Sequence, residues 1–231
     1  MNLMLLTTDA ETASINPALI YALITTLIIL TLAVLITDVR IAKGKNIHRI
    51  AKFEKIRFEI FKEDFKKNLE SYFPNITDEK IQEIYDNIKL PKRGTAGAAG
   101  YDIFSPIDAD LPFGESVVIP TGLRCRIDNG WDLELLPRSG GGFKYGIRLA
   151  NTSGVIDCDY YSSSRDGHIM VKLVNNDEAT NTSKKPFALE TGKGFAQGLF
   201  RIYGITEDDD ATEQRIDGFG STDKKPEEKS K

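Results

Sequence analysis

The sequence contains few of the residues from which disulfide frameworks, zinc sites and histidine-based active sites are built. Its 231 residues include 2 cysteines and 2 histidines. Cys125 and Cys158 are too few for a disulfide framework, so we expect reduced, strand-buried thiols in a cytosolic protein, with one disulfide as the minority alternative. No Cys/His cluster has zinc spacing, and His48 and His168 are expected to be structural or solvated, because Ser-His-Asp or Cys-His catalysis is improbable with so few histidines.

The sequence also lacks an excess of positive charge. A net charge of -4 argues against a nucleic-acid coat, and we predict no nucleic-acid partner. The composition, with 41% hydrophobic and 28% charged residues, 19 glycines and 9 prolines, excludes disorder and a collagen-like chain. The length suits one domain of about 150 residues with extra segments, or two small domains.

Apolar residues are concentrated near the start of the chain. Residues 12–37 carry no charge, and residues 17–37 are predicted to form a transmembrane helix in the lipid bilayer, because about 20 helical residues cross a bilayer core. The alternative is a buried helix of a soluble domain, which is usually amphipathic. Asp9 and Glu11 stand where a signal peptide would be basic, so the anchor is expected to be uncleaved. Excess Lys and Arg in residues 38–60 predicts a single-pass membrane protein with the carboxyl-terminal bulk of the chain in the cytoplasm.

Two helices are predicted between this segment and the rest of the chain. Residues 41–73 have apolar side chains near the 3.6-residue period, up to Pro74 and Asn75, and a second short helix is predicted to begin near Thr77 or Asp78. Residues 38–87 are therefore predicted to form an amphipathic helical spacer. A self-association surface and a basic helix on anionic lipid are alternatives, but the spacing does not hold the heptad of a coiled coil.

From residue 88 onward, short β-prone runs are separated by Gly, Pro, Asn and Asp. Strands are predicted at residues 116–120, 122–127, 131–136, 168–174 and 198–205. This pattern predicts an all-β antiparallel sandwich or barrel. We place the domain at residues 88–223, after an amino-terminal segment 1–16, the membrane helix and the spacer, and expect the charged tail 224–231 to be disordered.

Five glycine-flanked polar clusters in this part of the chain combine a tight backbone with groups suited to phosphate, metal or water. Glycine-rich turns expose backbone N–H groups to anions, and arginine adds a planar fork for phosphate oxygens. Each cluster alone is a weak signal, whereas their order is specific. The clusters are Ala-Gly-Tyr-Asp-Ile at residues 99–103, Pro-Arg-Ser-Gly-Gly-Gly at 137–142, Gly-Val-Ile-Asp-Cys-Asp-Tyr at 154–160, Ala-Gln-Gly at 196–198 and Arg-Ile-Asp-Gly-Phe-Gly-Ser-Thr at 215–222.

In this order the clusters resemble the five signature motifs of the homotrimeric dUTP pyrophosphatases, the dUTPases, over residues 88–222. The resemblance implies a jelly-roll subunit and a homotrimer whose active sites lie at subunit interfaces and use motifs of more than one chain. It implies the hydrolysis of dUTP to dUMP and pyrophosphate with Mg2+ on the triphosphate, which keeps uracil out of DNA and supplies dUMP.

The resemblance also implies a role for each motif residue. Asp157 would activate the water that attacks the α-phosphate, and Asp102 would hold Mg2+ through water. Binding of the phosphates is implied for Arg138, Ser139, Gly140 and Gln197, and reading of the base and sugar for Asn151, Gly154 and Tyr160. The last motif would close over the nucleotide, with Arg215 on the γ-phosphate, Phe219 on uracil, and Gly220, Ser221 and Thr222 on phosphate oxygens.

The chain departs from the usual family pattern at three places. Gly194 stands where arginine is common, Asp217 stands where glycine is common, and residues 161–166 lengthen the hairpin after Tyr160. The alternatives to the enzyme are a non-catalytic, membrane-tethered dUTP-binding sensor and, less favoured, a dCTP deaminase relative. The presence of Asp157, Arg138 and Arg215 favours the enzyme, since a dead scaffold would be expected to lose them.

Overall fold

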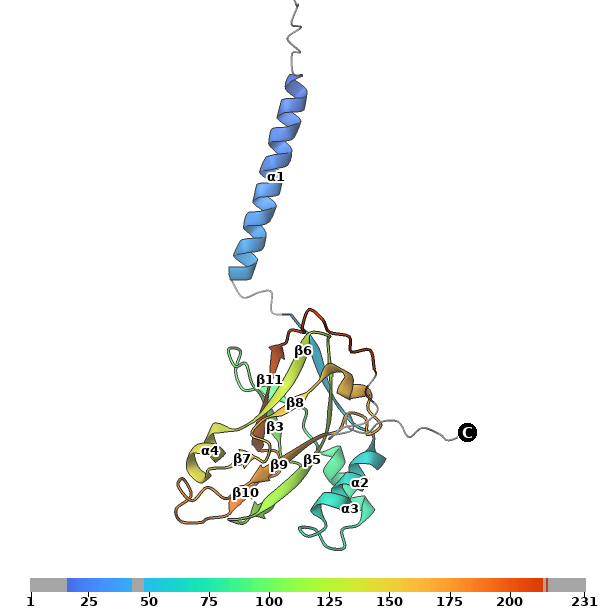
Figure 1. Ribbon diagram of the computed structural model, residues 1–231, viewed down its shortest axis with the longest axis vertical. Helices are drawn as coiled ribbons and strands as arrows, with labels where there is room; N and C mark the ends of the chain where they lie inside the picture. The colour runs from blue at the N-terminus through green and yellow to red at the C-terminus, as the bar shows by residue number, and fades with distance from the viewer. Residues whose placement is uncertain (1–15, 43–47, 214, 216–231) are drawn as a thin grey trace, which may run out of the picture. The chain divides into compact units, whose positions relative to one another are not determined.

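The computed structural model of the protein describes residues 16–42, 48–213 and 215, and the chain divides into two units, Met1–Arg49 and Ile50–Lys231. The first unit contains α1 (Pro17–Ala42), drawn in blue in Figure 1. The predicted helix at residues 17–37 is therefore present, and its part Pro17–Ile36 is long and apolar enough to cross a membrane. Residues 1–15 and the tail 224–231 lie outside the described residues.

Three threonine hydroxyls of α1 are hydrogen-bonded within the helix, and Asn16 caps its start. The Asn16 Oδ1 accepts a hydrogen bond from the backbone N of Ala18 at 2.9 Å. The hydroxyls of Thr25, Thr26 and Thr31 donate to backbone oxygens in the preceding turn. Because hydrocarbon offers no alternative partner for a hydroxyl, these internal bonds make the three threonines compatible with lipid.

The second unit is built on two antiparallel sheets. One sheet has the order β1–β5–β9–β7 and the other the order β2–β3–β11–β6–β8, while β10 and β4 form a separate pair. The strands are β1 (Ala51–Lys55), β2 (Lys92–Arg93), β3 (Tyr101–Phe104), β4 (Ala109–Leu111), β5 (Ser116–Ile127), β6 (Trp131–Pro137), β7 (Arg148–Leu149), β8 (Gly154–Ile156), β9 (Ile169–Val174), β10 (Phe187–Leu189) and β11 (Gly194–Ile202). From β5 to β9, successive strands alternate between the two sheets, and the predicted all-β antiparallel architecture is confirmed.

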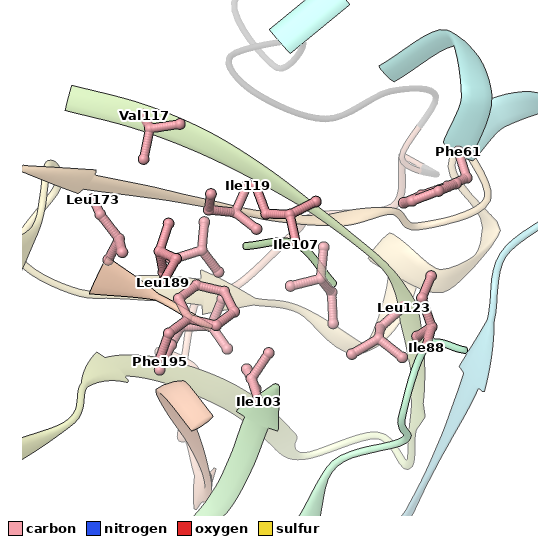
Figure 2. Close-up of a cluster of buried hydrophobic side chains, with 14 of the residues drawn as sticks. Phe61, Ile88, Ile103, Ile107, Val117, Ile119, Leu123, Leu173, Leu189 and Phe195 are labelled. Atoms are coloured by element: carbon pink, nitrogen blue, oxygen red, sulfur yellow. The ribbon is translucent and has the colours of Figure 1, made fainter. Parts of the chain in front are cut away.

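The core lies between the sheets and continues under the helices. In β5, Val117, Ile119 and Leu123 are buried, which follows the period of two expected of a strand with one buried face until the register shifts between Pro120 and Leu123. Figure 2 shows these side chains in one cluster that continues towards Phe61.

The predicted helical spacer at residues 38–87 is helical at residues 58–69 and 78–86, but residues 51–55 form a strand and the segment from residue 50 belongs to the β domain. Residues 51–55 form β1, which pairs along its whole length with β5, although the sequence pattern predicted a single helix over residues 41–73. Helix α2 (Phe58–Leu69) follows, and α3 (Asp78–Asp86) begins after the N-cap Thr77 as predicted. The apolar positions that suggested a free amphipathic helix are buried in the core of the β domain, including Phe61 and Phe65 at 0% exposure. This segment is thus part of the domain.

The contact of α2 with β5 requires a glycine. Gly122 has a φ of +70° at the register shift, and an added Cβ would stand 2.3 Å from the Ile88 side chain and 3.2 Å from the Phe61 ring. Both the backbone conformation and the close approach therefore demand a residue without a side chain.

The two cysteines are free in the structure. Cys125 is buried in β5 as predicted, and burial raises the pKa of its thiol to about 12. Cys158 differs from the prediction, because it lies half-buried in the short 3-10 helix η1 (Cys158–Ser162) rather than in a strand.

Candidate active site

The first cluster of predicted site residues joins three strands of the five-stranded sheet. Asp102 of β3 stands opposite Gln197 of β11, and Gln197 stands opposite Leu136 of β6, directly before the turn that carries Arg138. The Nε of Arg138 lies 3.2 Å from the Asp102 Oδ1, and the Nε2 of Gln197 donates to the backbone O of Pro137 at 3.2 Å. Three motifs that are distant in the sequence therefore meet at one place.

Gly194, one of the three departures from the motif pattern, is part of this cluster. The Nη1 of Arg138 donates to the Gly194 backbone O at 3.1 Å, and a Cβ at position 194 would stand 2.7 Å from that nitrogen. The guanidinium of Arg138 thus occupies the space that a side chain at residue 194 would need. The side chain of Arg138 is 44% exposed and that of Asp102 is 25% exposed, so both are within reach of a ligand.

Ser139 and Gly140 begin a short helix, α4 (Ser139–Tyr145), instead of the glycine-rich turn expected from the sequence. Gly140 has nothing within 4 Å of an added Cβ, so its backbone is open. Asn151 is exposed, and Gly154, the first residue of β8, is buried opposite Leu135 of β6. These four residues lie towards the Arg138 end of β6.

The second cluster surrounds Asp157, which follows β8. The guanidinium of Arg215 forms ion pairs with Asp157 and, at 2.9 Å, with Asp159. The same guanidinium lies over the ring of Tyr160, 5.8 Å from its centroid. Tyr160 is 7% exposed, and its hydroxyl donates to the backbone O of His168 at 2.8 Å. The structure therefore brings Asp157, Tyr160 and Arg215 together.

The environment of Asp157 is suited to a proton acceptor. Burial raises the pKa of its carboxyl, the charges of Asp159 and Asp132 act in the same direction, and Arg215 acts in the opposite direction. A carboxylate with a raised pKa is a stronger base, and a side chain that is 47% exposed can still reach a water molecule. The sequence did not predict that Asp132 and Asp159 raise the pKa of Asp157. The Asp-x-Asp spacing was the one signal for Asp159.

Within one chain, the two clusters lie at opposite ends of β6. Ile156 pairs with Leu133, so Asp157 adjoins Asp132 at the start of β6, whereas Arg138 follows its last residue. Six residues of extended chain separate these ends by about 20 Å. A single subunit therefore does not bring Asp157 to Asp102, Arg138 and Gln197.

The oxygen donors suit a magnesium ion that arrives with a polyphosphate. Among residues 16–42, 48–213 and 215, no group of three or more His, Cys, Asp or Glu side chains is placed to hold a metal. Asp102 offers one accessible carboxylate beside Arg138. Mg2+ keeps several waters and takes one or two carboxylates together with substrate phosphates, so this donor set fits a substrate-borne ion.

The predicted closing segment lies mostly outside the described residues. Arg215 is described, whereas Asp217, Phe219, Gly220, Ser221 and Thr222 are not. Of the two histidines, His168 is fully buried and bonded, and His48 is exposed.

Comparisons with known proteins agree on one family. The family model described as dUTPase matches residues 86–223. The deoxyuridine 5'-triphosphate nucleotidohydrolase of Dictyoglomus turgidum is 39% identical over 62% of this chain and 95% of its own length. The protein of that name in Lactococcus lactis is 35% identical over 58% of this chain and 88% of its own. A dUTPase crystal structure from Streptococcus mutans has 34% identity and a TM-score of 0.46, covering 53% of this chain and 91% of that one.

Proposed function

We propose that this chain, which belongs to the dUTPase family, hydrolyses dUTP to dUMP and pyrophosphate. The observation that carries the proposal is the accessible carboxylate of Asp157, whose pKa is raised by burial and which adjoins Tyr160 and Arg215. In this proposal, Asp157 accepts a proton from the attacking water and holds it in line with the α-phosphorus. Positioning of this kind supplies much of what phosphate substitution requires.

The cluster of Asp102, Arg138 and Gln197 would bind the triphosphate. Arg138, with Ser139 and Gly140, would contact the phosphates near the bond that breaks and stabilise charge as pyrophosphate leaves. Gln197 and Asp102 adjoin Arg138, and Asp102 would hold Mg2+ through a water. A bound Mg2+ would neutralise part of the triphosphate charge.

Base and sugar selection are assigned to the other motif residues. Asn151 and Gly154 would present backbone groups to uracil, and Tyr160 would pack beneath the sugar and exclude a 2′-hydroxyl. Arg215 would move from Asp157 to the γ-phosphate when the nucleotide binds. Phe219, Gly220, Ser221 and Thr222 would then close over uracil and the phosphates.

We infer a homotrimer from the separation of the two clusters. About 20 Å of β6 lies between Asp157 and Arg138, so a site that uses both must take them from different chains. A threefold assembly supplies three identical interfaces and hence three such sites.

We also propose that α1 anchors the protein in the membrane with the catalytic domain in the cytoplasm. The proposal rests on the apolar length of Pro17–Ile36 and on the basic residues that follow it.

The function is tested by measuring pyrophosphate release from dUTP by the full-length protein in a non-ionic detergent. We expect turnover with Mg2+ and its loss when EDTA is added. Asp157→Asn should lower kcat by about 100- to 10,000-fold and leave nucleotide binding intact, because it removes the base and keeps the shape. Asp110→Asn, which changes an exposed carboxylate of β4, is the matched control.

Two outcomes would contradict this assignment. Undiminished turnover by Asp157→Asn would remove that residue from its role. Tight binding of dUTP by the wild-type protein without any cleavage would favour the alternative of a non-catalytic sensor.

A further inference from the structure

The loop that follows Asp157 is held by a part of the chain outside the family domain. We define the recognition loop as residues 158–168 and the anchor segment as residues 50–65, which comprise β1 and the first two turns of α2. The family match begins at residue 86, so the anchor segment precedes it. Four residues of the recognition loop form ion pairs or hydrogen bonds with the anchor segment, and these contacts make three connections.

The first connection is a bidentate ion pair. The Nε and Nη2 of Arg57 donate to the two carboxylate oxygens of Asp166 at 2.8 and 2.9 Å, and the Arg57 backbone N donates to the same carboxylate at 3.1 Å. Asp166 has a φ of +55°, a conformation that few residue types adopt readily. Three hydrogen bonds thus fix the turn of the loop to the start of α2.

The second connection is centred on a buried carboxylate. Asp64 of α2 is 5% exposed, and its Oδ1 accepts from the Nη2 of Arg165 at 2.6 Å while its Oδ2 lies 2.6 Å from the Nδ1 of His168. Arg165 also pairs with Glu63 at 2.8 Å. His168 in turn accepts the hydroxyl of Tyr160 at its backbone O. His168 therefore links Asp64 to Tyr160, the side chain that the proposed function assigns to the sugar.

The third connection involves Tyr161, the neighbour of Tyr160. Its hydroxyl donates to the Glu54 Oε2 at 2.8 Å, and its ring stacks under the guanidinium of Arg124, 4.4 Å from the centroid. Arg124 of β5 also pairs with Glu54 at 3.2 Å. The recognition loop is thus attached to β1 at its beginning and to α2 at its end.

We propose that the anchor segment positions the recognition loop and thereby sets the discrimination between deoxyribose and ribose, with Arg57, Asp64 and Arg165 as positioning residues. The proposal rests on the proposed function, since it concerns selection at the same site. The loop is longer than usual for the family, and a long loop without its own sheet partners would hold Tyr160 loosely. The contacts with residues 54, 57 and 64 compensate, because each limits a different part of the loop.

The test uses the full-length double variant Arg57→Ala/Arg165→Ala. The side chains of Arg57 and Arg165 are 70% and 38% exposed, so their removal opens no cavity in the core. The matched control is Lys62→Ala/Lys66→Ala, which also removes two cations from this helical region. Lys62 and Lys66 both pair with Asp78 of α3 instead of the loop.

Two properties are measured for each protein: the ratio of the UTP inhibition constant to the KM for dUTP, and the hydrogen exchange of residues 158–168. We expect this ratio to fall about tenfold in Arg57→Ala/Arg165→Ala, the anchor variant, because small displacements of positioning groups have effects of this size or larger. Its loop should exchange faster, while the control retains the wild-type ratio and exchange. Arg57→Lys/Arg165→Lys should restore part of the ratio, since it returns the charges without the planar forks.

Other results overturn the proposal. An unchanged ratio in the anchor variant, or equal changes in both double variants, would show that the segment serves only stability. Failure of the wild-type protein to cleave dUTP would refute the proposed function, whereas hydrogen exchange would still report whether the loop is held. Unchanged exchange in the anchor variant would refute the anchoring itself.

Discussion

At the residue scale, the hydrogen bonds of His168 define its charge state. The backbone N of Gly122 donates to its Nε2 at 3.0 Å, so that nitrogen carries no proton, and the Nδ1 proton is directed at Asp64. Burial lowers the pKa of His168, Arg165 acts in the same direction, and Asp64 and Asp166 act against it. The imidazole is therefore neutral in the folded protein, and protonation would break its bond with Gly122.

This arrangement predicts a pH dependence of stability. Because the folded pKa of His168 lies below its unfolded value of 6.5, the unfolded chain takes up a proton first as the pH falls. Stability should therefore fall from about pH 6.5 down to the folded pKa, by at most roughly 1.4 kcal/mol per pH unit for one proton. Urea midpoints at pH 7.5, 6.5 and 5.5, followed by the fluorescence of Trp131, the one tryptophan of the chain, measure this.

The variant His168→Gln has no titrating group at this position, so its urea midpoint should change less between pH 7.5 and 5.5. The contribution of Asp64 falls in a separate range. Burial raises its pKa, but the hydrogen bond from His168 and the charge of Arg165 outweigh burial and lower the pKa overall. The stabilisation from Asp64 is thus lost only as the pH falls below 3.8, the pKa of this carboxyl in the unfolded chain. If the urea midpoints of the wild type and of His168→Gln changed equally with pH, the assignment of this pH dependence to His168 would be contradicted.

At the scale of elements, local pattern predicted the strands of the β domain better than the segment before it. Alternating and β-branched residues identified β5, β6, β9 and β11, although β5 is one strand with a register shift where two were expected. Residues 51–55, with the sequence Ala-Lys-Phe-Glu-Lys, have no strong strand signal. They form a strand because the edge of β5 is available for pairing, a tertiary effect that no local window contains.

The same limit applies to the site. The motif residues could be named from their order along the chain, but the ion pairs of Arg57, Asp64 and Arg165 could not, because their partners are about 100 residues apart and follow no repeating pattern. The occupation of the Gly194 position by Arg138 likewise depends on strand register.

The helix α1 carries a prediction of its own. Its side chains from Pro17 to Ile36 are exposed and almost all apolar, so the full-length protein should sediment with membranes and be released by detergent and not by alkaline carbonate or high salt. A reporter fused at the carboxyl terminus should report the cytoplasm. The matched variant replaces Leu27 and Leu30 by arginine, which should abolish insertion. Recovery of unprocessed wild-type protein in the soluble fraction would contradict the insertion of α1 into the membrane.

At the scale of the whole molecule, the anchor segment is part of the β domain and not a spacer before it. Residues 51–55 complete the edge of a sheet, and α2 contributes Phe61 and Phe65 to the hydrophobic core, so truncation just before the family match would remove part of that core. A domain cut at residue 86 should therefore be a poor substitute for the full chain in any assay.

The last prediction concerns assembly. Asp157→Asn leaves the cluster of Arg138 intact, and Arg138→Gln leaves Asp157 intact; each variant alone should be inactive. If every site combines Asp157 of one chain with Arg138 of another, random mixed trimers of the two variants should regain roughly a quarter of the wild-type sites. If one chain supplies both residues, no mixed trimer has an intact site. The measurement is dUTP turnover after unfolding and refolding the two variants together, compared with each refolded alone and with refolded wild type. Because the clusters are about 20 Å apart along β6, we expect the mixture to be active. A mixture no more active than its components, although the wild type recovers on refolding, would place the complete site within a single chain.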